Sequence, residues 1–260
     1  MMQTNRRLAR SMPENDALVS SRDMRPPSIP NPNRGLLLTL SGPDGSGKTT
    51  QARLLASALN AVGVPATVRK YDARRSKQLG HGIARLRREA DDRDTLGFEE
   101  DVAYLMGADQ VNFMWGPSVM GLIDAGRTVI VDRYVWDFLI TVRVAFGVSG
   151  SGLAHLLDRA PVPDLSILLV VPPDHAARQV IRRTSYSSLH PLESEQVLAR
   201  KCKAYELLGQ SPGIIAVDGT ASPRQVHDRI WKAVIHSKAL SGRGNVGASL
   251  PEQVLSSATS

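Results

Sequence analysis

Residues 42–49 read Gly-Pro-Asp-Gly-Ser-Gly-Lys-Thr, a complete G-x-x-x-x-G-K-[ST] pattern. The apolar run Leu-Leu-Leu-Thr-Leu precedes this stretch at residues 36–40, and the helix-forming residues 51–56 follow it. In the order strand, glycine-rich loop and helix, the backbone N–H groups of the loop and the positive end of the helix face a bound anion together. The sequence therefore predicts a nucleoside triphosphate as the first ligand.

Each residue type in this loop has a chemical task. Glycines let the backbone curl around the phosphates, the lysine reaches the β- and γ-phosphates, and the threonine hydroxyl contacts Mg²⁺. A glycine-rich turn that merely precedes a helix is the alternative interpretation, and the flanking strand and helix argue against it. The residues expected to bind the phosphates of ATP are Gly42, Gly45, Ser46, Gly47, Lys48, Thr49 and Thr50.

Length and composition limit the class of protein. A chain of 260 residues with 42% hydrophobic residues can form one α/β domain with a substantial core, and no apolar run has transmembrane length. The single cysteine, Cys202, cannot form an internal disulfide, which fits a cytoplasmic protein. The net charge of +7 favours anionic partners. Because the arginines are dispersed and not interleaved with aromatics, we expect a phosphate-rich small molecule rather than nucleic acid, and no membrane.

The two ends of the chain differ in composition from its centre. Residues 1–33 carry four prolines, and residues 241–260 are rich in serine, glycine and alanine, so both are predicted to be disordered tails. The acidic residues of the first segment argue against a targeting signal. The folded domain is expected at residues 34–240.

Strand and helix patterns alternate through this domain. Continuous apolar strands that alternate with helices predict a parallel sheet with helices on both faces. In such sheets the ligand lies beyond the carboxyl ends of the strands, which makes the residues that follow each strand the candidate site. The expected strands are 36–40, 65–71, 128–132, 165–171 and 214–218, and the expected helices include 76–90 and 98–124.

Asp132-Arg133-Tyr134 forms the second motif, at the end of the apolar strand 128–132. A carboxylate at the tip of a strand can hold Mg²⁺, and an adjacent arginine can bind two phosphate oxygens at once. The alternative interpretation is an ordinary salt bridge at the end of a strand. The phosphate loop in the same chain favours the metal- and phosphate-binding interpretation.

Together, the motifs resemble the thymidylate kinase family. The resemblance rests on Asp44 within the loop, on the helix start Lys48-Thr49-Thr50-Gln51, on the strand that leads into Arg133-Tyr134, and on Pro-Asp-Leu-Ser-Ile-Leu-Leu at residues 163–169. It covers about residues 35–238, including Pro-Asp-His-Ala-Ala-Arg-Gln-Val-Ile-Arg-Arg at 173–183.

This resemblance implies the nucleoside monophosphate kinase fold, with a five-stranded parallel sheet, helices on both faces and a lid. It also implies transfer of the γ-phosphoryl group of ATP to a nucleoside monophosphate, a requirement for Mg²⁺, and a homodimer. By resemblance, Asp44 lies near the transferred group, Asp132 binds the metal with Thr49, and Arg133 handles the acceptor phosphate.

A basic stretch predicts the lid at about residues 183–191. Arg178 and Arg182 lie four residues apart on an expected helix and so share a face, with Arg183 at its exit. Phosphoryl transfer needs positive charge on the moving group and exclusion of water, which an arginine-bearing flap supplies. We expect Arg182 and Arg183 to act in catalysis and Arg178 to bind ATP. A solvated basic helix end is the alternative interpretation.

The acceptor side departs from the family pattern. Where the family carries Arg-Glu-Pro-Gly, this chain reads Lys-Tyr-Asp-Ala-Arg-Arg at residues 70–75. Methionine and glutamine replace a base-stacking phenylalanine and a nucleotide-binding arginine in the long helix, and a thioether has no aromatic face. The residues expected to bind the acceptor are Asp72, Arg74, Arg75, Met106, Gln110, Arg133 and Tyr134.

An intact donor side beside an altered acceptor side predicts a kinase for dTMP or for another or modified nucleotide. Two alternatives remain open at this point. One is a kinase that phosphorylates the hydroxyl of a deoxynucleoside, with Asp72 as the base. The other is a non-catalytic nucleotide-binding regulatory module.

Overall fold

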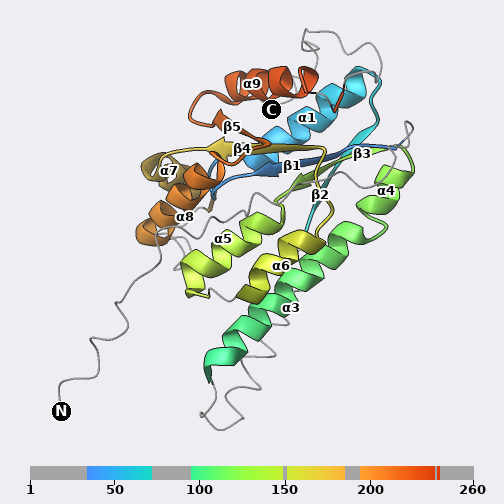
Figure 1. The fold of residues 1–260 in the computed structure, drawn as a ribbon. Coiled ribbons are helices and arrows are strands. Elements are labelled where there is room, and N and C mark those ends of the chain that lie inside the picture. The colour runs from blue at the N-terminus through green and yellow to red at the C-terminus, as the bar shows by residue number, and fades with distance from the viewer. Residues whose placement is uncertain (1–33, 72–94, 149–150, 185–193, 238, 241–260) are drawn as a thin grey trace, which may run out of the picture.

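The sheet contains five parallel strands. The computed structural model describes residues 34–71, 95–148, 151–184, 194–237 and 239–240. Within these residues the strand order is β2-β3-β1-β4-β5, and every neighbouring pair is parallel (Figure 1). The expected five-stranded parallel α/β fold is thus confirmed. The strands are β1 (Leu37–Ser41), β2 (Ala66–Lys70), β3 (Thr128–Asp132), β4 (Leu165–Val170) and β5 (Ile214–Asp218).

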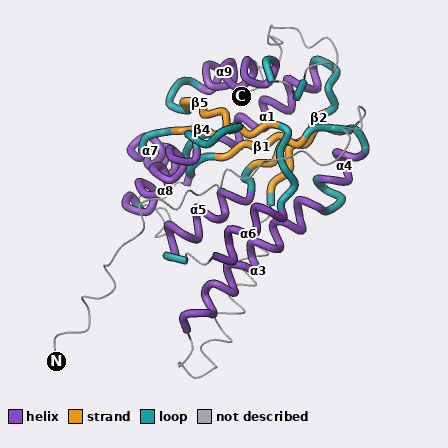
Figure 2. The backbone as a smooth tube through the Cα atoms, in the orientation of Figure 1, coloured by secondary structure: helices purple, strands orange, loops and turns teal. Residues whose placement is uncertain are grey.

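Helices cover both faces of the sheet. One layer contains α1 and α9, and the other contains α3, α5, α6 and α8 (Figures 1 and 2). None of the helices within the described ranges is long and apolar enough to span a membrane. The helices are α1 (Lys48–Ala61), α3 (Thr95–Trp115), α4 (Met120–Asp124), α5 (Val135–Phe146), α6 (Ser151–Arg159), α7 (Pro173–Thr184), α8 (Glu195–Leu208) and α9 (Pro223–Ile235).

The central strand β1 shows why helices cover both faces of the sheet. Successive side chains of a strand point to opposite faces, so Leu38 and Leu40 pack with α1 and α9 while Leu37 packs with α3 and α5. All three leucines are at most 1% exposed. The continuous apolar run that the sequence shows is therefore the signature of a strand buried on both sides.

One sequence-based expectation was wrong. Residues 98–124 were expected to form a single helix, but α3 ends at Trp115 and α4 begins at Met120. Between them lie Gly116 and Pro117. Proline has no N–H to donate and disfavours helical geometry in the residue before it, so the helix stops there.

Some expectations fall on residues outside the described part of the chain. These are the helix at 76–90, the tails 1–33 and 241–260, and residues 185–191 of the lid.

The site is positioned by the central strand. β1 leads through the phosphate loop into α1, and its two neighbours, β3 and β4, lie on opposite sides of it. The chain therefore departs from β1 at the point where the strand order reverses, with the carboxyl ends of β3 and β4 on either side. That crevice is where parallel α/β sheets bind their ligands.

Candidate active site

The loop between β1 and α1 has the backbone geometry of an anion cradle. Gly45 has a φ of +83°, and a Cβ there would lie 2.3 Å from the carbonyl oxygen of Ala176, so only glycine fits. Gly47 caps α1 with a φ of +84°, and the first turn of α1 carries no acidic side chain. No acidic side chain of this turn therefore competes with a ligand, and the positive end of the helix can face phosphate oxygens.

Lys48 lies folded against this loop. Its side chain is 5% exposed, and its Nζ donates a 2.9 Å hydrogen bond to the carbonyl oxygen of Pro43. Burial and the nearby Arg133 guanidinium lower the pKa of Lys48 to about 8, against the opposing attraction of Asp44. The ammonium is therefore a buried cation that an anionic ligand would stabilise.

Thr49 and Asp132 offer hard oxygen ligands for a divalent metal. The Thr49 Oγ1 donates a 2.6 Å hydrogen bond to Asp132 Oδ2, and the Lys70 Nζ lies 3.5 Å from the same oxygen. The other oxygen, Asp132 Oδ1, is buried and has no hydrogen-bond partner among the described residues. A hydroxyl beside a free carboxylate oxygen fits Mg²⁺, which commonly takes only one or two protein ligands and fills its shell with water and phosphate oxygens.

Asp44 is surrounded by cations. Arg133 holds a φ of +84°, rare for a residue with a side chain, and its Nη2 is hydrogen-bonded to Asp44 Oδ1. Lys201 from α8 lies 3.6 Å from Asp44 Oδ2, and the Lys48 Nζ lies 3.9 Å from Oδ1. Burial alone would raise the pKa of Asp44, but Arg133, Lys48 and Lys201 together lower it well below its ordinary value.

Asp137 is a buried carboxylate that connects the elements around the phosphate loop. Its carboxylate, 2% exposed, accepts hydrogen bonds from the Tyr205 hydroxyl at 2.7 Å, the Tyr134 backbone N–H at 2.8 Å and the Ser41 hydroxyl at 2.5 Å. The Gly42 N–H lies 3.4 Å from it. One side chain therefore joins the end of β1, the start of α5 and the C-terminal part of α8.

A cavity of about 620 Å³ opens above the loop. Six cationic side chains and one carboxylate lie on its wall, so it suits a ligand with several negative charges. The lining residues are Asp44, Gly45, Gly47, Lys48, Thr49, Thr50, Arg53, Lys70, Arg133, Gln179, Arg182 and Arg183.

Several predicted site residues are not on this wall. Arg178 is exposed and paired with Asp174 at 2.8 Å on its own helix. Tyr134 is buried, and its hydroxyl donates to the carbonyl oxygen of Pro161 at 3.0 Å. Met106 is half-buried and Gln110 is 3% exposed, both on α3.

Three of the predicted acceptor contacts, Asp72, Arg74 and Arg75, lie outside the described residues. Of the predicted loop residues, Gly42 and Ser46 are buried within the loop rather than on the cavity wall.

Sequence reasoning missed five residues of this region. Asp137 had a usable signal, because an acid at the third position of a helix accepts hydrogen bonds from the residue before that helix. Lys201 had none, since it lies on α8 and meets Asp44 only through the tertiary fold. The missed residues are Arg53, Lys70, Asp137, Gln179 and Lys201.

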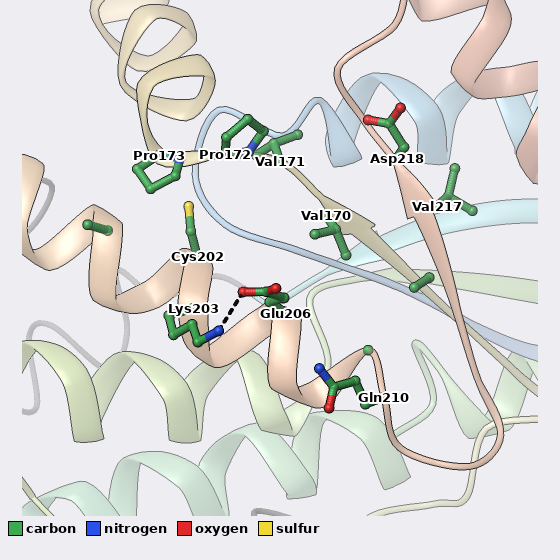
Figure 3. A pocket seen from close by; sticks show the side chains of 13 residues that line it. Val170, Val171, Pro172, Pro173, Cys202, Lys203, Glu206, Gln210, Val217 and Asp218 are labelled. Carbon is green, nitrogen blue, oxygen red and sulfur yellow. Dashed lines mark hydrogen bonds and ion pairs between the residues drawn. The ribbon is translucent and has the colours of Figure 1, made fainter.

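A second cavity of about 630 Å³ lies between α8 and the ends of β4 and β5 (Figure 3). Its wall is largely apolar, with Val170, Val171, Pro172 and Pro173 on one side. The polar groups at its edge include Lys203, which pairs with Glu206 at 3.0 Å. Arginine is missing from its described wall, so the loop cavity is the better place for a polyphosphate.

Comparison with known proteins gives a consistent result. A family model described as thymidylate kinase matches residues 40–230. A probable thymidylate kinase of Pyrococcus abyssi is 30% identical over 205 residues, which cover 78% of this chain and 97% of the relative. The thymidylate kinase of Xanthomonas campestris pv. campestris is 30% identical over 216 residues, 82% of this chain and 88% of the relative. The thymidylate kinase of Xylella fastidiosa is 30% identical over 193 residues, 74% and 83% of the two chains.

Proposed function

Because the chain belongs to the thymidylate kinase family, we propose that it transfers the γ-phosphoryl group of ATP to the phosphate of dTMP or a closely related nucleoside monophosphate. The products are ADP and the nucleoside diphosphate. The observation that carries this proposal is the convergence of Lys48, Asp44 and Arg133 on one cationic cavity. Thr49 on the same wall is hydrogen-bonded to the buried Asp132 carboxylate.

On the donor side, the chain's own groups bind and orient the triphosphate. The loop amides and the start of α1 receive the phosphates. Lys48 exchanges its hydrogen bond to the Pro43 carbonyl for the β- and γ-phosphate oxygens, whose negative charge stabilises the buried ammonium. Arg182 and Arg183 on α7 line the same cavity and offset charge on the transferred group.

Mg²⁺, held by Thr49 and Asp132, would neutralise charge on the β- and γ-phosphate oxygens when bound. Lys70, whose Nζ lies 3.5 Å from Asp132 Oδ2, also lines the cavity and would be available to a phosphate on the acceptor side. Arg133, whose guanidinium is hydrogen-bonded to Asp44, lines the same cavity and would bind a phosphate oxygen of the acceptor. The chemistry needs positioning and charge rather than a covalent protein intermediate.

A panel of acceptors tests this function. We expect ADP release with ATP, Mg²⁺ and dTMP, with a product heavier than dTMP by one phosphoryl group in mass spectrometry. Thymidine should give no product, because the cationic cavity is suited to an acceptor that carries a phosphate. Turnover with thymidine alone would favour the deoxynucleoside kinase. Normal ATP binding without transfer to any nucleotide or nucleoside would favour the binding module.

A matched pair of variants ties the activity to the loop. Lys48→Met should reduce turnover by at least about 100-fold, since it removes a buried cation from the phosphates. Lys203→Met, which removes an exposed lysine of α8, should leave turnover unchanged. Equal activity in both variants would place the donor elsewhere.

We also propose that the chain forms a homodimer and lies in the cytoplasm. The exposed side chains of Leu105 and Trp115, each 52% exposed on α3, support the dimer. The single cysteine, buried and free, supports a reducing compartment.

A further inference from the structure

A buried lysine of α8 reaches the centre of the site. Lys201 is 4% exposed, and its neighbours on the buried face of α8 include Val197, Leu198 and Tyr205. A cation in such surroundings is costly unless a carboxylate compensates it. The compensating group is Asp44, whose Oδ2 lies 3.6 Å from the Lys201 Nζ.

The two oxygens of Asp44 are held from different parts of the fold. Arg133, at the junction of β3 and α5, binds Oδ1, whereas Lys201, on α8, lies against Oδ2. Partners on both oxygens fix the rotation of the carboxylate as well as its position. The carboxylate in turn orients the Arg133 guanidinium, which lines the cavity while Lys201 does not.

The face of α8 that carries Lys201 differs from the face that carries its neighbours in sequence. Cys202 and Lys203 line the second cavity, where Lys203 pairs with Glu206 (Figure 3). Lys201 instead reaches the phosphate loop. The helix thus offers a functional candidate and an exposed control lysine two residues apart.

We propose that Lys201 is a positioning residue for phosphoryl transfer, which holds Asp44 and through it Arg133 in the reactive arrangement. The proposal rests on the proposed function. When the phosphates of donor and acceptor enter, the negative charge of Asp44 opposes them, and Lys201 offsets that charge without touching either substrate. Its effect therefore belongs to the transition state more than to ATP binding.

A double-mutant cycle tests this role. Lys201→Met should lower kcat by about 10- to 100-fold and change the KM for ATP by less than about threefold. Asp44→Asn should behave in the same way. Because Lys201 acts through Asp44, the double variant should be no slower than the slower single variant. Lys203→Met should keep the kcat and KM of the unchanged chain.

Two kinetic results would overturn the proposal. The first is a Lys201→Met variant with unchanged kcat. The second is a double variant whose loss equals the product of the two single losses, because independent effects multiply.

Thermal denaturation of the unchanged chain, the two single variants and the double variant tests the Lys201–Asp44 contact independently of catalytic activity. We expect non-additive shifts in Tm, because each single change leaves the other charge without its partner. Additive shifts would refute the proposal even in a chain that transfers no phosphate. If the shifts in Tm are non-additive but the unchanged chain transfers no phosphoryl group, the Lys201–Asp44 contact stands and only the proposed function is overturned.

Discussion

At the scale of single residues, Lys48 is a buried cation with a lowered pKa beside the phosphate loop. Burial and Arg133 lower its pKa to about 8, although Asp44 lies 3.9 Å from its Nζ and opposes this shift. A polyphosphate ligand would reverse this shift and raise the pKa of Lys48. Nucleotide binding should therefore be linked to proton uptake by one lysine.

The linkage gives a pH-dependent affinity. Below pH 8 Lys48 is already charged, whereas above pH 8 the free protein must take up a proton to bind ATP. The Kd for ATP should therefore rise with pH, by about fivefold between pH 8 and pH 9. Isothermal titration calorimetry measures the Kd and, in buffers of different ionisation enthalpy, the proton uptake.

Lys48→Met supplies the comparison. Its Kd should be larger at pH 7 and should not increase further between pH 8 and pH 9. A flat Kd in the unchanged chain over the same interval would contradict the assignment of Lys48 to the phosphates.

Single residues also mark the limit of prediction from sequence. Lys48 and Thr49 were predicted because their task fixes a spacing within one loop. Asp132 and Arg133 were predicted because they lie at the carboxyl end of a strand. Lys201 could not be predicted in this way, since its approach to Asp44 depends on how α8 packs.

At the scale of elements, Asp137 shows how three segments are joined below the loop. The carboxylate accepts from Ser41 at the end of β1, from the Tyr134 N–H before α5, and from Tyr205 on α8. Burial first, and then the Asp137 charge, raise the pKa of Tyr205 well above its usual value, so the phenol stays a donor. The start of the phosphate loop is therefore fixed by a side chain outside the loop.

Removal of this carboxylate should loosen the three elements together. Asp137→Ala leaves buried donors unsatisfied and should cost about 3 kcal/mol in the free energy of unfolding. For a domain of this size the Tm should fall by about 6–12 °C, measured by circular dichroism. Asp158→Ala, which removes an exposed partner of His155 on α6, should change the Tm by less than about 2 °C. An equal change in both variants would show that the Asp137 network contributes little.

The elements themselves were more predictable than their ends. All five strands were expected because double burial forces continuous apolar runs, and that pattern is local in sequence. The long helix was extended too far because apolar residues continue past Pro117, although the regular helix ends at Trp115. Periodicity reports which residues are buried, and proline decides where the helix ends.

At the scale of the whole molecule, the sheet is covered on both faces, but α3 still presents apolar side chains to solvent. Leu105 is 52% exposed near the middle of this helix, and Trp115 is equally exposed at its end. Sequence periodicity could not separate these exposed residues from core residues, because α3 carries apolar side chains of both kinds. A second copy of the chain is the partner that the proposed dimer assigns to this face.

The dimer can be tested by a charge placed on that face. Leu105→Lys should convert a particle of twice 28.2 kDa into one of 28.2 kDa in sedimentation velocity, since a buried unpaired ammonium opposes association. The control is Leu207→Lys, which changes a leucine of similar exposure, 49%, on α8 and should leave the dimer intact. A monomeric unchanged chain, or dissociation by the Leu207 change alone, would contradict α3 as the interface. Because both leucines are exposed within the chain, neither variant should lower the Tm of the monomer by more than about 2 °C.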